Sequence, residues 1–214
     1  MSKYVITIGR QFGSGGREIA KGLAHKLGIP FYDKDILDKI AEERGLPKDL
    51  LEAMDETLTG NLRHRIGYGL HSLAMMYGTP VDYSTHDDAI MTNDRIFNWK
   101  AKLIRELAEE GPCVIVGRCA DYILRDEPGL ISVFISAPMA DREARIMKLH
   151  PELHDNAPAA LIRQTDKARA SYYNYHTDRN WGDIDNYHLC VDATRLGKEG
   201  TIDFLAEYVT HCAK

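Results

Sequence analysis

Short apolar runs without charge alternate along this chain with longer amphipathic segments. Residues 4–8, 113–116 and 130–135 are runs rich in β-branched and aliphatic side chains, which predict buried strands. Two weaker strands are predicted at residues 28–32 and 186–191. Elsewhere apolar residues recur three or four positions apart, which predicts helices at residues 19–27, 33–44, 46–56, 92–110, 140–149, 157–173 and 197–211. Uncharged strands alternating with helices favour an α/β fold with a parallel sheet covered on both faces.

A glycine-rich segment, GRQFGSGGREIA at residues 9–20, joins the first predicted strand to the first predicted helix. Its glycines let the backbone turn tightly and approach a ligand without a Cβ atom in between. The first N–H groups of a helix lack partners within the helix, and the helix dipole favours an anion there. The segment therefore predicts a phosphate site formed by Gly13, Ser14, Gly15, Gly16, Arg17 and Glu18. A glycine-rich turn that only connects the two elements is the alternative.

The segment departs from the common phosphate-loop pattern G-x-x-x-x-G-K-[ST]. Gly15 matches the last glycine, and Arg10 stands where the opening glycine is expected. Gly16 occupies the lysine position and Arg17 the hydroxyl position. The backbone donors are kept, whereas the usual cation and the metal-binding hydroxyl are missing. Arg10 or Arg17 could supply the charge in a different geometry, because a guanidinium can bind phosphate through two hydrogen bonds.

Further candidates lie at the carboxyl ends of the predicted strands, where open α/β sheets bind their ligands. Asp33 follows the strand at residues 28–32, and Gly117-Arg118 follow the strand at residues 113–116. Together with the glycine-rich segment they predict one cleft. Asp33 also stands at the start of the next helix, where an N-cap residue is expected, and the local sequence fits both roles equally.

Three regions are open to more than one interpretation. Residues 57–90 lose helical periodicity, which is typical of a substrate-covering insertion, of a partner surface, or of an excursion with its own small core. In the helix at residues 157–173, Arg163 and Arg169 belong to a charged stretch. Such a stretch is either solvated surface with local ion pairs or a set of functional arginines. The aromatic-rich residues 172–183 predict a loop that packs over the cleft or stacks on a nucleobase.

The composition narrows the class of protein. A length of 214 residues suits one domain, residues 1–214, with a sizeable core. A net charge of −5 argues against broad nucleic-acid binding, and no apolar run approaches the roughly 20 residues of a membrane helix. The first residues lead directly into a predicted strand, so we expect no secretory signal. The four cysteines and nine histidines show no metal-binding or disulfide spacing. We therefore expect a cytoplasmic protein without a structural metal. The oligomeric state is left open.

The chain resembles the cytidylate kinase-like proteins, relatives of bacterial cytidylate kinase among the phosphate-loop nucleoside monophosphate kinases. The resemblance spans nearly the whole chain and is carried by residues 6–20, 116–118, 120–121, 133–138, 142, 145, 166–169, 172–173, 181–183 and 186–187. It implies a three-layer P-loop NTPase fold with a central five-stranded parallel sheet flanked by helices. It also implies a lid at residues 150–185 and a substrate-binding insertion at residues 57–90.

The same resemblance implies an activity, the transfer of the γ-phosphoryl group of ATP, with Mg²⁺, to a nucleoside monophosphate such as CMP or dCMP. Gly13 to Gly16 would then wrap the donor phosphates, and Arg118 would hold the acceptor phosphate. Asp33 would lie near the acceptor or its metal, and Arg163 and Arg169 would close from the lid onto the transferring group. The expected catalytic residues are Arg17, Asp33, Arg163 and Arg169.

The chain differs from cytidylate kinase itself at positions that leave the acceptor open. Val116 and Cys119 stand where cytidylate kinases carry aspartates, and Asp121 is the expected substrate-binding substitute for one of them. Two other functions therefore remain. One is a non-catalytic nucleotide-binding or regulatory module, which Gly16 in the lysine position favours. The other is a kinase for a non-nucleotide metabolite.

Overall fold

The computed structural model describes residues 4–45 and 84–213 and, for residues 84–93, the backbone alone. Its contacts divide the chain into two compact units, Met1–Leu37 with Ile104–Lys214 and Asp38–Leu103. The strands are β1 Val5–Arg10, β2 Phe31–Tyr32, β3 Cys113–Val116, β4 Leu130–Ser136 and β5 Leu189–Asp192. The helices are α1 Gly16–Leu27, α2 Lys34–Glu43, α5 Ser84–Glu110, α6 Ala120–Ile123, α7 Met139–Leu149, α8 Ala157–Thr177 and α9 Ala193–Cys212, with a 3₁₀ turn at Ile184–Asn186.

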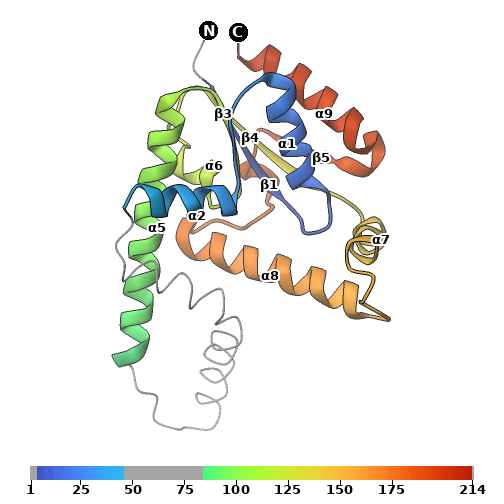
Figure 1. Ribbon diagram of the computed structural model, residues 1–214, viewed down its shortest axis with the longest axis horizontal. Coiled ribbons are helices and arrows are strands. Elements are labelled where there is room, and N and C mark those ends of the chain that lie inside the picture. The colour runs from blue at the N-terminus through green and yellow to red at the C-terminus, as the bar shows by residue number, and fades with distance from the viewer. Residues whose placement is uncertain (1–3, 46–83, 214) are drawn as a thin grey trace. The chain divides into compact units, whose positions relative to one another are not determined.

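The five strands form one sheet in the order β2-β3-β1-β4-β5, and every pair is parallel (Figure 1). The parallel five-stranded sheet predicted from the sequence is thus confirmed. Strand β1 lies in the middle, and its Ile8 pairs with Val116 of β3 and Val133 of β4. The loops that follow β1, β3 and β4 therefore leave the sheet at the same edge, where ligands of such sheets bind.

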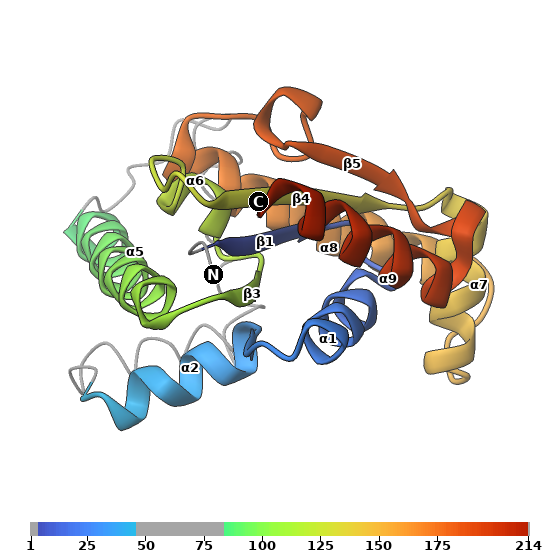
Figure 2. The same cartoon turned by 90° about the horizontal axis from the view of Figure 1, so that it is seen from above.

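One face of the sheet is covered by α1 and α9, which lie side by side (Figure 2). A Cβ atom on Gly22 of α1 would overlap Ile202 of α9, so glycine permits this close approach. The residues that fill this layer are almost all aliphatic and fully buried, and they include Ile6, Ile8, Ile19, Leu23, Val114, Val116, Val133, Ile135, Leu205 and Val209. Burial of these side chains is the main stabilising contribution to the layer.

Helix α8 crosses beneath the carboxyl ends of the strands, next to α7, and the opposite face of the sheet carries α6 (Figures 1 and 2). Phe134 of β4 points to this side and packs against the rings of Trp181 and Tyr187, with centroids 5.4 and 4.9 Å away. Helix α8 runs beneath the strands from α7 to α6, where its Tyr173 donates to Asp121. This position brings the middle of α8 to the loop between β1 and α1.

Several element boundaries differ from the prediction. Helix α5 begins at Ser84 rather than at residue 92, so residues 84–90 of the expected insertion are helical. Helix α8 continues to Thr177, through part of the aromatic stretch expected as a loop, because Tyr173 and Thr177 form a buried face four residues apart. Residues 46–83, which include the predicted helix at 46–56 and most of the expected insertion, lie outside the described residues. Among the described helices, none is long and apolar enough to cross a bilayer.

Candidate phosphate-binding site

The loop between β1 and α1 has the backbone conformation that its glycines permit. Gly13 and Gly15 both have φ of +80°, a region that side chains other than glycine rarely adopt. Gly15 is the residue before α1, and no side chain caps the helix there. A Cβ atom on Gly13 would lie 3.1 Å from the carbonyl oxygen of Arg142, so the loop also packs closely against α7.

The loop amides fall into two groups. Phe12 donates its N–H to Asp166 on α8, Ser14 donates to the Gln11 carbonyl, and Gly16 donates to the Ser14 hydroxyl at 3.3 Å. Within residues 4–45 and 84–213, no hydrogen bond is made by the amides of Gly13, Gly15, Arg17 and Glu18. These open donors lie at the N-terminus of a helix, which is a favourable place for an anion.

A pocket of about 210 Å³ lies beside this loop. Besides the loop, it is lined by the start of α7 and the start of α9, including Asp141, Arg145, Thr194 and Lys198. Arg145 forms an ion pair with Glu18, and its guanidinium carbon would lie 3.1 Å from a Cβ atom on Gly15. The pocket thus combines backbone donors with two cationic side chains, which suits a phosphorylated ligand.

Asp33 and Arg17 form an ion pair at the start of α2. Arg17 donates its Nε to Asp33 at 2.7 Å, and the Asp33 side chain is only 5% exposed, against 63% for Arg17. Asp33 also accepts the Ile36 amide at 3.1 Å, so it caps α2 as well as holding Arg17. Burial opposes ionisation of Asp33, but the hydrogen bonds from Ile36 and Arg17 outweigh it and lower the pKa of this carboxyl. Asp33 is therefore negatively charged at neutral pH.

Arg118 follows β3 in an unusual backbone turn. Gly117, Arg118 and Cys119 have φ of 72°, 59° and 57°, so three successive residues are left-handed. The left-handed conformation costs roughly 1–2 kcal/mol for each residue that carries a Cβ atom. Strain of this kind clusters at functional sites. It presents Arg118 at the edge of the sheet where β1 also ends.

Four arginines gather around the end of β1. Arg169 on α8 donates to the carbonyl oxygen of Arg10 at 2.8 Å. Burial, followed by the positive charges of Arg169 and Arg118, lowers the pKa of Arg10. Arg17 adds a weaker effect of the same sign, and Asp33 opposes it. The structure therefore brings together Arg17, Asp33, Arg118 and Arg169 from the predicted set, and it adds Arg10, which the sequence indicated only as a possible source of charge.

Two of the predicted site residues lie elsewhere. Asp121 is buried beneath α8, where the Tyr173 hydroxyl donates to its carboxylate at 2.6 Å. Burial raises the pKa of Asp121 despite this hydrogen bond. Arg163 is exposed on α8 and makes no ion pair within the part of the chain that the structure describes. Their predicted roles in substrate binding and transfer stay predictions.

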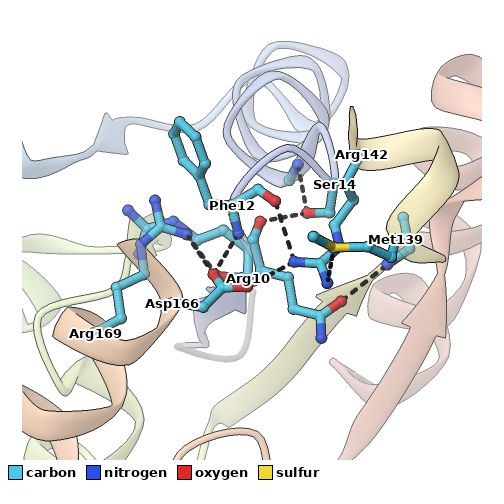
Figure 3. Close-up of polar contacts among 10 residues, drawn as sticks. Arg10, Phe12, Ser14, Met139, Arg142, Asp166 and Arg169 are labelled. Atoms are coloured by element: carbon cyan, nitrogen blue, oxygen red, sulfur yellow. Dashed lines mark hydrogen bonds and ion pairs between the residues drawn. The ribbon is translucent and has the colours of Figure 1, made fainter. Parts of the chain in front are cut away.

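Asp166 and Arg142 were missed by the sequence-based prediction of site residues. Arg142 of α7 donates to one oxygen of Asp166 at 2.6 Å, while the other oxygen accepts the Phe12 amide at 2.7 Å (Figure 3). Arg142 also donates to the Phe12 carbonyl at 3.4 Å. The sequence signal was an aspartate three positions before Arg169 on a charged helix face, which equally fits a solvated surface pair.

Comparison with known proteins identifies the family and the fold of this chain. An uncharacterized protein from Eubacterium ventriosum is 26% identical over 97% of this chain and 98% of its own, with a TM-score of 0.69. Shikimate kinase from Bacteroides thetaiotaomicron shares the fold at 16% identity over 97% and 98% of the two chains, with a TM-score of 0.51. None of the curated proteins matches the sequence. The profile of the cytidylate kinase-like family matches residues 5–195, and the chain, with its P-loop kinase fold, belongs to that family.

Proposed function

We propose that this protein transfers the γ-phosphoryl group of ATP to a small acceptor, with a nucleoside monophosphate of the CMP or dCMP type as the first candidate. The observation that carries the proposal is the convergence of open amides and arginines at the carboxyl end of β1. The amides of Gly13, Gly15, Arg17 and Glu18 are open among the described residues, and Arg10, Arg118 and Arg169 gather beside them. Membership of the cytidylate kinase-like family supports a phosphotransferase.

The donor side is the glycine loop with the adjoining pocket. The open amides would bind the terminal phosphates of ATP, because helix N-termini favour anions. Arg145 and Lys198 line the same pocket and would neutralise further negative charge. Thr194 and Asp141 offer polar contacts to the sugar or base, and the two side chains already hydrogen bond each other at 3.3 Å.

The acceptor side is the turn at Arg118. Arg118 would hold the acceptor phosphate, and Arg163 and Arg169 would approach from α8 to stabilise the charge of the transferring group. In phosphoryl transfer the protein contributes mainly positioning and charge neutralisation, and one well-placed arginine can contribute about 10³-fold or more. The half-buried position of Arg169 next to Arg10 supports its role, whereas Arg163 would have to move inward.

A magnesium ion would arrive with ATP and would neutralise charge that develops on the phosphate oxygens. Mg²⁺ usually keeps several waters and takes only one or two protein carboxylates in addition to substrate phosphates. Asp33 fits this requirement, because its lowered pKa keeps it ionised and its charge acts on Arg10. Among the described residues, no group of three His, Cys, Asp or Glu side chains is placed to hold a metal ion.

The test is a coupled assay of ADP release with Mg²⁺ and a panel of acceptors. The panel contains CMP, dCMP, UMP, AMP, GMP and dTMP, together with hydroxylated sugars and acids that represent non-nucleotide metabolites. We expect ADP release that depends on one acceptor class and exceeds the slow release without acceptor. If only a non-nucleotide acceptor gives turnover, that compound is the acceptor and a nucleoside monophosphate is not.

A non-catalytic nucleotide-binding module is the second candidate, and it is favoured by Gly16, which leaves the position of the usual lysine without a side chain. This candidate predicts saturable ATP binding by calorimetry and silence with every acceptor. Absence of ATP binding altogether would count against both functions.

A further inference from the structure

Arg10 and Gly16, which hold two unusual positions of the glycine loop, are in direct contact. A Cβ atom on Gly16 would lie 2.6 Å from the Cβ and 3.1 Å from the Cγ of Arg10. Real Cβ atoms do not approach this closely, so residue 16 can be glycine and little else while Arg10 is present. This contact explains why position 16 has no lysine. The Cβ and Cγ atoms of Arg10 occupy the space that the first atoms of a lysine side chain would need.

The same arginine reaches a second glycine. A Cβ atom on Gly117 would overlap Nη1 of Arg10 and lie 3.2 Å from its Cζ. The Arg10 side chain thus extends from the N-terminus of α1 to the turn after β3. Its stem lies at the glycine loop and its guanidinium at the turn that carries Arg118, and the proposed reaction needs a phosphate group at each of these two places.

The guanidinium of Arg10 lies in surroundings that favour an anion. Arg169, Arg118 and Arg17 add positive charge around it, and Asp33 supplies negative charge that is already shared with Arg17. Within the described residues, the Arg10 guanidinium makes no hydrogen bond or ion pair. Burying like charges together is unfavourable unless an anion compensates them.

We propose that Arg10 is the phosphate-binding cation of this loop, and that it takes the place of the lysine missing at position 16. Arg10 in the glycine position and Gly16 in the lysine position, the two departures from the common motif, are then explained together as an exchange of the two residue types. The cation moves to the position of the opening glycine, and glycine takes the position of the lysine to make room for it. The inference rests on the proposed function for the identity of the phosphate compound, while the exchange itself concerns any polyphosphate.

The experiment compares Arg10→Met, Arg10→Gly, Gly16→Lys and the double variant Arg10→Gly/Gly16→Lys in the full chain. Binding of Mg-ATP and of inorganic tripolyphosphate is measured by calorimetry. Because a hydrogen bond to a charged group is lost, we expect Arg10→Met and Arg10→Gly to weaken both Kd values about 10- to 100-fold. Gly16→Lys alone should also weaken binding, because its Cβ atom collides with Arg10. The double variant restores the sequence G-x-x-x-x-G-K and should bind at least about 10-fold more tightly than either of its single variants.

Melting temperatures separate a binding role from a structural one. Arg10→Met keeps the stem over Gly16 and removes a charge from a positive cluster, so without ligand the variant should melt no lower than the wild type. The rise in melting temperature that tripolyphosphate produces in the wild type should disappear. Arg125→Met, which alters a surface arginine paired with Asp126, is the matched control and should keep this rise.

The outcomes distinguish this inference from the proposed function. If Arg10→Met binds tripolyphosphate as the wild type does, Arg10 is not the cation and the inference is overturned. If the double variant binds no better than Arg10→Gly, the exchange between the two positions is overturned. If the wild type binds polyphosphate through Arg10 but turns over no acceptor, the inference holds and the kinase proposal fails. If the wild type binds neither ligand, both fail.

Discussion

The backbone N–H of Phe12 donates a hydrogen bond of 2.7 Å to the carboxylate of Asp166, 154 positions later in the chain. The second carboxylate oxygen accepts Arg142 at 2.6 Å, so one side chain connects the glycine loop with both α7 and α8. A carboxylate on this amide occupies a donor that a phosphate oxygen could otherwise use. The position of α8 therefore determines whether the Phe12 amide is available to a ligand.

Substitution of Asp166 by alanine should destabilise the protein. The change leaves the mostly buried guanidinium of Arg142 unpaired, which we expect to lower the free energy of unfolding by about 3 kcal/mol. Urea denaturation measures the effect. Asp126→Ala removes an aspartate with an 87% exposed side chain and should stay within about 0.5 kcal/mol of the wild type. Equal effects of the two changes would show that Asp166 contributes nothing beyond surface charge.

Asp33→Asn should separate the two roles of this residue. Asparagine caps helices as well as aspartate does, so the free energy of unfolding at neutral pH should change by less than about 1 kcal/mol. If Asp33 positions Arg17 or the metal, kcat should fall about 10- to 100-fold. Steady-state kinetics with the best acceptor provides the measurement. Unchanged kcat would leave Asp33 with the capping role alone.

The same variant should alter acid stability. The folded-state pKa of Asp33 is lowered from its ordinary value of 3.8, so its ionised form stabilises the fold above that pH. This contribution is lost as the pH falls through the lower pKa of the folded protein. The stability difference between wild type and Asp33→Asn should therefore shrink between about pH 6 and about pH 3. A difference that is constant over this range would contradict the assignment.

Asp121→Asn should stabilise the protein at neutral pH. Burial raises the pKa of Asp121, so its contribution to stability is greatest at low pH and is lost as the pH rises through the raised value. The amide oxygen of asparagine can still accept the Tyr173 hydroxyl. Thermal melts should show an advantage of the variant that grows between about pH 4 and about pH 7. A KM for the acceptor raised 10-fold or more (about 1.4 kcal/mol) would instead support the predicted substrate-binding role.

Arg163→Ala tests whether the exposed arginine of α8 reaches the transferring group. Because the side chain is exposed, the free energy of unfolding should change by no more than about 0.5 kcal/mol. If α8 closes during transfer, kcat should fall about 10³-fold, as for other arginines that stabilise transferring phosphate. Lys167→Ala is the matched control on the same exposed helix. A kcat equal to that of the control would remove Arg163 from the catalytic set and leave Arg169.

The core of the fold follows from local patterns in the sequence. The uncharged runs of β1, β3 and β4 favour strands that are buried on both faces, which is typical of a parallel sheet between helices. Glycines 13 and 15, directly before a helix, likewise predict the loop and its open amides from nearest-neighbour chemistry alone. These features depend on residues close in the chain, so the amino-acid sequence by itself determines them.

Contacts between distant segments decided the rest. The sequence pattern around Asp166 fits a surface residue, whereas the packing of α8 places its carboxylate on the Phe12 amide. Asp121 is buried under α8, where its carboxylate accepts the Tyr173 hydroxyl. Gly16 could be identified as a missing lysine from its position. Its proposed cause, the Arg10 side chain above it, emerged only when the loop folded back on the end of β1. The burial of a side chain and the charges around it depend on which distant segments pack together. The periodicity of the sequence does not specify that packing.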